Sequence, residues 1–224
     1  MISTGGVDFV AGLYRRYAAD LVRVVEQQRA VLLAADGVVR PGLDDLEAEI
    51  SYLLLRRLRP EHVVEIGTSR GSSTSWLLSA LRDNDRGRLV SFRRSRRPSA
   101  VPPELAEDRW TVYTGDVRAR LEALPGTTDY LLLNAAHTRR FGRWYVRTVF
   151  PRLPSGTPVG VHEVYRGRST WVRRDGGVVL DWLAERDVPH FTVAPRRRRR
   201  SSPRSPICAG SWASRGRAGR APTR

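Results

Sequence analysis

The feature that most constrains the fold is an apolar run that leads through a glycine-containing loop into a second apolar run. Residues 63–66 are followed by Gly67 and Gly71, and residues 76–81 form the next apolar stretch. We interpret this pattern as a strand, a tight turn and a helix whose start is capped by the hydroxyl residues 72–74. Glycine has no Cβ, so the backbone of such a turn can approach a ligand closely. The free N–H groups of the helix start favour polar or anionic groups.

The size and composition of the chain indicate one core and no membrane partner. The chain has 224 residues, of which 41% are hydrophobic, and no apolar run approaches the length needed to cross a bilayer. Residues 1–8 lack a basic segment followed by a long apolar stretch, so we expect no signal peptide. The single cysteine, Cys208, excludes an internal disulfide and a cysteine-based zinc site. These features predict a cytoplasmic protein.

The positive charge is concentrated in one segment. The formal net charge is +16, but residues 196–224 contain ten arginines and no acidic residue, which leaves +6 for the rest. All 39 basic residues are arginines, as expected equally from a GC-rich genome and from phosphate contacts. Two interpretations of the segment stay open. It is either a basic arm for nucleic acid or acidic partners, or the product of out-of-frame translation.

Helical and strand patterns alternate along most of the chain. Apolar residues at three- and four-residue steps predict one amphipathic helix over residues 7–35 and another over residues 44–58. A loop is expected at residues 171–175. The remaining elements are predicted from apolar runs and periodicity: strands at 63–66, 88–92, 110–113, 129–133, 158–161 and 190–194, and later helices at 117–124, 144–149 and 177–187.

This order of elements predicts an α/β fold with three parts. Residues 46–194 are expected to form a Rossmann-like, doubly wound and mostly parallel sheet. Residues 1–45 are expected to form an N-terminal helical cap. Residues 195–224 have almost no apolar periodicity and are predicted to be a disordered Arg-rich tail.

The glycine turn resembles a known family motif. The spacing Glu65-x-Gly67-x-x-x-Gly71 differs from the Gly-x-Gly-x-x-Gly of dinucleotide enzymes and is similar to motif I of class I S-adenosylmethionine (SAM)-dependent methyltransferases. The run Glu-Ile-Gly-Thr-x-x-Gly-x-Ser most resembles small-molecule O-methyltransferases related to macrocin O-methyltransferase and the cephalosporin-hydroxylase-like group. The resemblance covers about residues 46–194.

This resemblance implies a set of cofactor-binding residues. Glu65, Gly67, Thr68 and Gly71 would surround the methionine portion of SAM, and Asp116 would lie near the adenine amino group. An alternative for Asp116 is that it caps the helix that follows it. The other residues implied in the cofactor site are Ser69, Ser73, Phe92, Gly115 and Asn134.

The chain departs from the family pattern at three positions. Arg93 stands where a Rossmann-like fold normally offers an acidic residue to the ribose hydroxyls. Relatives typically carry Asp-x-Asp-His after the fourth strand, whereas this chain has Asn134 and Ala136 in the two acidic places. An amide is a poor ligand for a hard cation without nearby carboxylates, so no divalent metal is expected. Glu163, after the fifth strand, is the one weak candidate ligand.

Two histidines at predicted strand ends are the candidate general bases. His137 follows the fourth strand and His162 follows the fifth. An imidazole titrates near neutral pH and can remove a hydroxyl proton. The alternative is that each is a hydrogen-bonded histidine without a catalytic role.

The leading functional hypothesis is a SAM-dependent methyltransferase that acts on a hydroxyl of a small molecule, such as a sugar or a secondary-metabolite scaffold. A second hypothesis is a non-catalytic relative that kept the glycine turn, for which the three departures are the evidence. A third is an Arg-rich nucleic-acid binder, for which the tail supplies charge but no reading motif. A homo-oligomer is compatible with each hypothesis.

Overall fold

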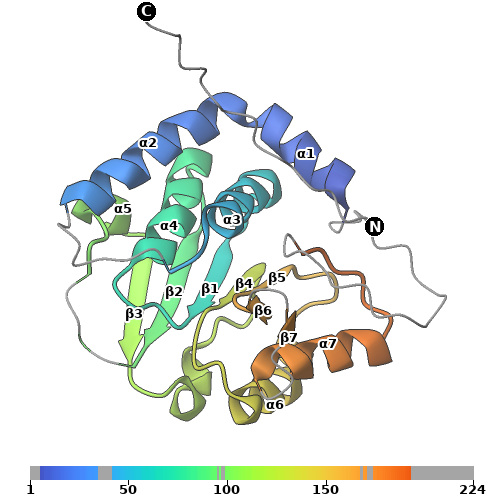
Figure 1. Ribbon diagram of the computed structural model, residues 1–224. Coiled ribbons are helices and arrows are strands. Elements are labelled where there is room, and N and C mark those ends of the chain that lie inside the picture. Colours follow the sequence, from blue (N-terminus) through green and yellow to red (C-terminus); the bar gives the residue numbers. More distant parts are fainter. Residues whose placement is uncertain are drawn as a thin grey trace, which may run out of the picture.

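The sheet lies at the centre of the molecule and carries helices on both faces (Figure 1). The computed structural model describes residues 6–34, 42–94, 96, 99–166, 169–170 and 174–192. The predicted tail lies outside these residues. The sheet has five strands in the order β3-β2-β1-β4-β5, and all neighbouring strands are parallel. The strands are β1 (His62–Ile66), β2 (Arg88–Arg93), β3 (Trp110–Thr114), β4 (Tyr130–Leu133) and β5 (Val159–Val161).

The strand order creates a topological switch point beside β1. The chain runs from β1 outward to β2 and β3, and then returns to place β4 on the opposite side of β1. Open α/β sheets bind ligands in the crevice at this point, outside the carboxyl ends of the strands. The structure therefore confirms the predicted Rossmann-like α/β fold and places the end of β1 beside the end of β4.

The central strands are buried on both sides, as their apolar sequences predict. All four residues of β4 are buried, and the residues of β1 after His62 are buried too. Strands covered on both faces read as continuous apolar runs. One core cluster fills the space between the sheet and helices α1 to α4, and a second lies under α6 and α7.

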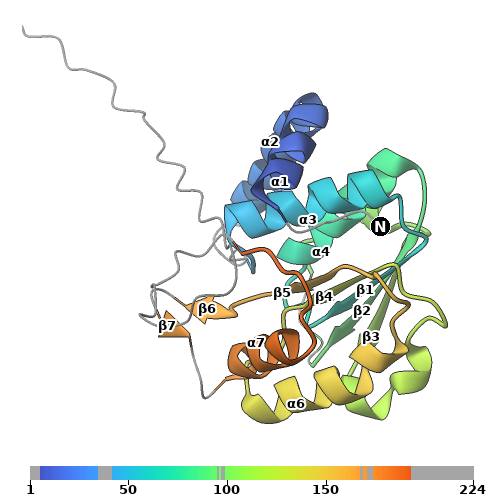
Figure 2. The same ribbon diagram turned by 90° about the vertical axis from the view of Figure 1, so that its right-hand side faces the viewer.

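The predicted helix over residues 7–35 is in fact two helices. Helix α1 (Val7–Arg16) ends at Tyr17, whose φ of −113° and ψ of 23° are not helical, and α2 (Ala18–Ala34) follows. The Tyr17 hydroxyl donates to the carbonyl of Arg56 in α3 (Asp45–Leu58) over 3.3 Å. Figure 1 shows the bend that this break produces, and Figure 2 shows that both helices lie above α3. A single straight helix could not follow this path.

Helix α3 begins and ends where the sequence predicts. Asp44 Oδ1 accepts a hydrogen bond from the Glu47 N–H over 2.8 Å, and the Glu47 side chain accepts from the Asp44 N–H, which makes a capping box. The helix ends at Arg59, whose φ is +51°, immediately before Pro60.

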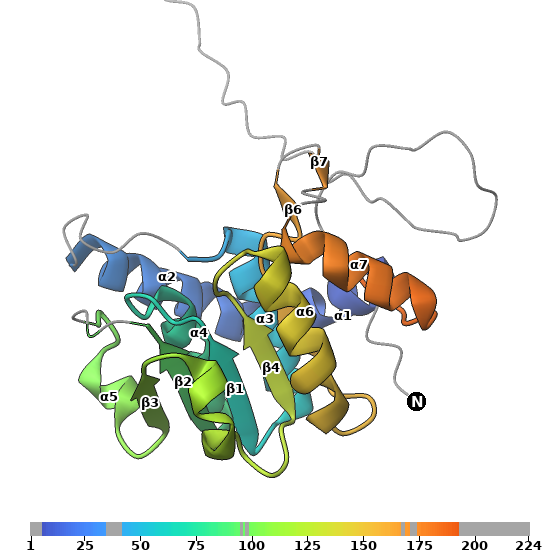
Figure 3. The same cartoon turned by 90° about the horizontal axis from the view of Figure 1, so that it is seen from below.

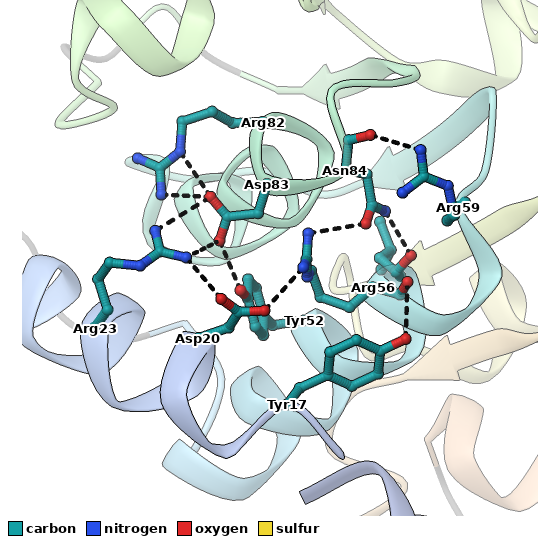
Figure 4. Close-up of polar contacts among 10 residues, drawn as sticks. Tyr17, Asp20, Arg23, Tyr52, Arg56, Arg59, Arg82, Asp83 and Asn84 are labelled. Atoms are coloured by element: carbon teal, nitrogen blue, oxygen red, sulfur yellow. Dashed lines mark hydrogen bonds and ion pairs between the residues drawn. The ribbon is translucent and has the colours of Figure 1, made fainter.

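An ionic cluster centred on Asp83 fastens α2 to α3 and to α4 (Ser72–Asn84) (Figure 4). The carboxylate of Asp83 accepts from the Tyr52 hydroxyl over 2.6 Å and pairs with Arg23 at 3.2 Å and Arg82 at 2.8 Å. Burial acts to raise the pKa of Asp83, but the hydrogen bonds from these three side chains outweigh it and lower the pKa. Further polar contacts of the cluster involve Tyr17, Asp20, Arg56, Arg59 and Asn84.

The other face of the sheet is covered by α6 (Arg139–Thr148) and α7 (Asp175–Glu185), which lie side by side (Figure 3). A two-stranded antiparallel ribbon, β6 (Tyr165–Arg166) and β7 (Ser169–Thr170), precedes α7. The short helices are α5 (Pro103–Ala106), η1 (Val117–Ala119), η2 (Leu121–Ala123) and η3 (Phe150–Arg152).

Two expected elements differ in the structure. The helix predicted over residues 117–124 is replaced by the two 3₁₀ turns η1 and η2. The strand predicted over 190–194 is wrong for residues 190–192, which are not in a strand, while residues 193 and 194 lie outside the described residues. The start of the predicted loop, at residues 171–173, is also outside them. In the described part of the chain the sheet therefore ends at β5.

Candidate functional site

The turn after β1 depends on both of its glycines. Gly67 has a φ of +107°, and a Cβ built on it would lie 2.1 Å from the carbonyl oxygen of Asn134. Gly71, at φ +90°, is the N-cap of α4, and a Cβ there would lie 2.5 Å from a methyl carbon of Val101. Because an L side chain rarely adopts such φ values, other residues would be strained at both positions. Both glycines are therefore required for the turn to pack closely against the end of β4 and against Val101.

Glu65 lies beneath this turn and is completely buried. Its Oε1 accepts a hydrogen bond from Ser73 Oγ over 2.5 Å, and its Oε2 accepts from Thr74 Oγ1 over 2.7 Å and from Ser91 Oγ over 2.8 Å. Burial raises the pKa of Glu65, and the hydrogen bonds from the hydroxyls offset this only in part. The carboxyl group joins β1, the first turn of α4 and β2.

The hydroxyls of residues 72–74 do not cap α4, so that prediction is wrong. Gly71 is the N-cap and provides no side-chain hydrogen bond, while Ser73 and Thr74 point their hydroxyls inward at Glu65. A buried carboxyl group needs several donors, and these two residues supply them.

The side chains of the turn differ in exposure. Thr68 is 5% exposed, and its Oγ1 lies 2.6 Å from Thr74 Oγ1, whereas Ser69 is exposed. Among the residues implied to bind the cofactor, Glu65, Thr68 and Ser73 therefore have internal partners. The turn offers a ligand mainly its backbone and Ser69.

The end of β2 presents an aromatic pair and an arginine. Phe92 is 2% exposed and stacks on Tyr113 of β3, with ring centroids 5.5 Å apart and an interplanar angle of 22°. Its carbonyl accepts hydrogen bonds from the N–H groups of Gly67 and Thr68. The neighbouring Arg93 directs its Nε to the hydroxyl oxygen of Thr114 over 3.3 Å. Phe92 thus supports the glycine turn from below.

The end of β3 carries Gly115 and Asp116. Gly115 has a φ of +126°, and its N–H donates to the carbonyl of Arg93 over 2.8 Å. Asp116 caps η1 by accepting from the Arg118 N–H over 3.0 Å, as the capping alternative predicted. The Arg118 guanidinium also binds this carboxylate, and these contacts lower the pKa of Asp116 to about 2.

Asn134 lies at the end of β4, directly beside the glycine turn. Its N–H donates to the carbonyl of Ile66 over 2.9 Å, and its amide nitrogen lies 3.4 Å from the carbonyl oxygen of Gly42. The Gly42 N–H in turn donates to Ser72 Oγ over 3.2 Å. The segment that enters α3 therefore bridges the end of β4 and the start of α4.

A pocket borders the turn on the side of the N-terminal helices. It lies between α2, α3 and α4. Its lining residues include Val25, Leu32, Leu43, Gly71, Ser72 and Trp76.

The two predicted bases, His137 and His162, lie together at the ends of β4 and β5. Their ring centroids are 5.9 Å apart, and the rings meet edge to face. His137 places Nε2 at 3.7 Å from Glu163 Oε2 and Nδ1 at 3.5 Å from Asp175 Oδ2. The ends of β4 and β5 and the start of α7 thus bring together two imidazoles and two carboxylates.

His162 is held by the N-terminal part of α3. Its Nδ1 lies 2.6 Å from Glu47 Oε2, in the same side chain that closes the capping box. Burial acts to lower the pKa of His162, but the hydrogen bond and charge of Glu47 outweigh it, so the pKa is raised. Because its pKa is raised, His162 keeps its second proton to a higher pH than a free imidazole does, and the protonated ring can donate a hydrogen bond from each nitrogen.

The residues at these strand ends do not fit a divalent metal. Asn134 directs its amide nitrogen at Gly42, and Ala136 offers no ligand. Within residues 6–34, 42–94, 96, 99–166, 169–170 and 174–192, no group of three or more His, Cys, Asp or Glu side chains could hold a metal ion.

Sequence reasoning missed Glu47, Arg118 and Asp175. The fold brings Glu47 to His162, and a local turn brings Arg118 to Asp116. Neither Glu47 nor Arg118 belongs to a recognisable motif. Asp175 is the first residue of α7 and precedes two glycines, which is the one local signal that a close contact was required there.

Taken together, these observations define an α/β protein with a glycine turn at the switch point beside β1, where open α/β sheets bind ligands. Residues 64–164 match the model of a family described as a methyltransferase domain. The middle of the chain is therefore a methyltransferase domain, which confirms the class of enzyme predicted from the glycine turn.

Several solved structures resemble this fold. The O-methyltransferase from Bacillus cereus in complex with SAH is 20% identical, with a TM-score of 0.53 over 76% of this chain and 80% of that chain. A cofactor-bound protein from MTB is 22% identical, with a TM-score of 0.56 over 71% and 77%. A proposed caffeoyl-CoA O-methyltransferase from Staphylococcus aureus is 21% identical, with a TM-score of 0.54 over 79% and 90%. These similarities establish the fold.

None of the curated proteins matches the chain. Among the helices formed by described residues, none is long and apolar enough to cross a membrane.

Proposed function

We propose that this domain transfers a methyl group from SAM to a hydroxyl group of a small molecule. The observation that carries the proposal is the turn Gly67–Gly71, which stands at the switch point inside the stretch that matches a methyltransferase domain. Both glycines are required for the turn to pack against Asn134 and Val101, and a turn at the switch point lies where open α/β sheets bind their ligands. The O-methyltransferase descriptions of the solved neighbours support transfer to oxygen.

Different residues of the chain would bind the methionine and the adenine portions of SAM. The backbone of Gly67–Gly71, together with Ser69, would hold the methionine portion of SAM, while Glu65 and Ser73 fix the turn from beneath. Gly115 and Asp116 would lie on the adenine side, and Asn134 would border the crevice. When bound, SAM supplies an electrophilic methyl group on a positively charged sulfur.

His137 is the residue we assign as general base. It would accept the hydroxyl proton of the acceptor while the fold holds the acceptor in line with the methyl group. His162, with its raised pKa and its bond to Glu47, would instead donate a hydrogen bond that orients the acceptor.

Arg93 favours a second candidate, a methyltransferase-type domain without catalytic activity. This arginine occupies the end of β2, where an acid would hold the ribose hydroxyls, and it contacts Thr114.

Calorimetric titration of SAM and S-adenosylhomocysteine into the purified chain tests the proposal. We expect micromolar binding that is lost in Gly67→Arg and kept in Gly12→Arg. A Cβ at Gly12 meets no atom within 4 Å, so this variant introduces the same charge without blocking the turn. If a folded protein binds neither compound, the enzymatic proposal fails and the non-catalytic candidate remains.

A further inference from the structure

We infer that Asp175 is a positioning residue that holds the ring of His137 in the orientation and tautomer of a general base. The inference deepens the proposed function and rests on His137 being the base. It starts from two neighbouring polar atoms. Of the four buried side-chain polar atoms without a hydrogen-bond partner among the described residues, two are His137 Nδ1 and Asp175 Oδ1.

The two side chains face each other across a short gap. His137 Nδ1 lies 3.5 Å from Asp175 Oδ2, and the side chains are 19% and 5% exposed. A buried polar atom without a partner costs free energy, and a shift of a few tenths of an ångström would convert this approach into a hydrogen bond. The pair is therefore poised to form an N–H to carboxylate bond.

Two glycines fix the position of Asp175. A Cβ on Gly142 of α6 would lie 2.8 Å from Asp175 Cα, and a Cβ on Gly176 would lie 2.6 Å from the carbonyl oxygen of Val164. Any other residue would push α7 away from α6 or from the end of β5. The absence of both side chains lets α7 bring its first residue directly to His137.

Tyr145 approaches the same oxygen of the Asp175 carboxyl group as His137 does. Its hydroxyl lies 3.5 Å from Asp175 Oδ2 and is assigned as a donor to it. Burial raises the pKa of Tyr145 far above its ordinary value, with a further contribution from Asp175, so this hydroxyl keeps its proton. Tyr145 thus remains a donor at all working pH values.

A competing carboxylate faces the other nitrogen of the same ring. Glu163 Oε2 lies 3.7 Å from His137 Nε2, but it lies equally far from a guanidinium nitrogen of Arg174. The Glu163 side chain is 27% exposed, against 5% for Asp175. Solvent and Arg174 screen the charge of Glu163, whereas the drier Asp175 acts on Nδ1 with less screening. Asp175 therefore determines which nitrogen carries the proton.

The consequence is a neutral ring with its proton on Nδ1 and a lone pair on Nε2. His137 would take the hydroxyl proton of the acceptor at Nε2 while the oxygen forms its bond to the methyl carbon. The electron pair of the broken carbon–sulfur bond stays on sulfur, and the imidazolium that results is stabilised by the Asp175 carboxylate.

Nitrogen-15 NMR of the imidazole rings tests the inference without any substrate. The chain contains four histidines, so the His137 signals can be assigned by their loss in His137→Gln. We expect the neutral His137 ring to be mainly the Nδ1–H tautomer in the wild type and in Asp175→Glu. We expect Asp175→Asn to shift it toward the Nε2–H tautomer, because an amide can donate to Nδ1. The matched control Asp181→Asn, at an exposed position of α7, should change nothing.

The same variants are then assayed for methyl transfer to the hydroxylated acceptor on which the wild type turns over. Asp175→Asn should lower kcat at least about tenfold, as loss of an oriented base does, with unchanged affinity for SAM. Finding the Nε2–H tautomer in the wild type overturns the inference even if Asp175→Asn does not fold. Unchanged tautomer and kcat in a folded Asp175→Asn also overturn it. Absence of SAM binding would instead reject the proposed function, whatever the tautomer.

Discussion

At the scale of single residues, the shape of the turn depends on Gly67 and on the buried Glu65 below it. The backbone of Gly67 is so close to Asn134 that the ends of β1 and β4 leave no room for a side chain. Glu65 holds the first turn of α4 through Ser73 and Thr74. The same residues that shape the crevice therefore also stabilise the fold.

Gly67→Ala should destabilise the protein and remove SAM binding. The new Cβ would meet the Asn134 carbonyl at 2.1 Å in a backbone conformation of φ +107°, so we expect a loss of at least about 2 kcal/mol in the free energy of unfolding. Urea denaturation measures this loss. Gly12→Ala, inside helix α1 with open space around it, should gain up to about 1 kcal/mol. Equal effects of the two substitutions would contradict the role of the turn.

The pair of His162 and Glu47 should make stability depend on pH. The pKa of His162 is raised in the folded state, so the protonated ring stabilises the folded protein. This stabilisation is fully present below the ordinary pKa of 6.5 and is lost as the pH rises through the folded-state pKa. The stability difference between the wild type and His162→Gln should therefore be larger near about pH 6 than near about pH 9. Thermal unfolding across this range measures it. The exposed His190→Gln should show no comparable trend.

Sequence patterns located the turn but not the partners of its side chains. The positions of Gly67 and Gly71 follow from spacing, because only glycine suits such φ values. The inward direction of Ser73 and Thr74 could not be predicted, because a helix start offers a hydroxyl either the backbone or a buried group. Which one it takes depends on where β1 places Glu65.

At the scale of elements, the N-terminal helices are fastened by polar contacts as much as by apolar ones. Helix α2 buries only Leu21, Val24 and Gln28, while its Asp20 and Arg23 enter the cluster around Asp83. An element with so small an apolar face relies on its ionic contacts for its position.

Asp83→Ala should therefore loosen α2 strongly. The Asp83 side chain is 5% exposed, and its loss would leave Tyr52, Arg23 and Arg82 without their shared acceptor. We expect a loss of about 3 kcal/mol in the free energy of unfolding. Arg23→Ala should cost less than about 1 kcal/mol, because its side chain is 46% exposed. Urea denaturation, together with hydrogen exchange of the α2 amides, compares the two variants. Similar losses in the free energy of unfolding would show that the cluster is not centred on Asp83.

Strands were easier to predict than helix breaks. The central strands β1 and β4 are largely apolar runs, and burial on both faces requires such runs. The break at Tyr17 has no glycine or proline to signal it, because the bend is imposed by packing on α3. The approach of Asp175 to His137 was equally hidden, since it depends on how α7 packs against α6.

At the scale of the whole molecule, the net charge is distributed unevenly along the sequence. Residues 1–195 carry a net charge of only +6, and residues 196–224 carry the other +10. We propose that residues 195–224 act independently of the methyltransferase domain. This division, like that at residue 45, was predicted from composition and remains a prediction.

Removal of residues 195–224 should leave SAM affinity and thermal stability unchanged and should abolish any binding of the full chain to duplex DNA. The removed segment carries ten arginines, which account for most of the +16 net charge. Fluorescence anisotropy over a range of salt concentrations measures the change, since each phosphate contact contributes about 0.9 to the log–log slope. DNA affinity that survives truncation would place the basic surface on the domain itself.

The distance along the chain between the parts of the candidate base site affects the order in which the protein can mature. The three strands β1 to β3 are complete at Thr114, and β4, which ends at Leu133, completes the switch point. His162 and its partner Glu47 are 115 residues apart in the sequence. The partner of His137, Asp175, is synthesised later still, at the start of the last described helix. During synthesis the chain would complete the turn Gly67–Gly71 and the switch point first, and it would orient the proposed base His137 last. A growing polypeptide could therefore hold SAM before it is able to use it.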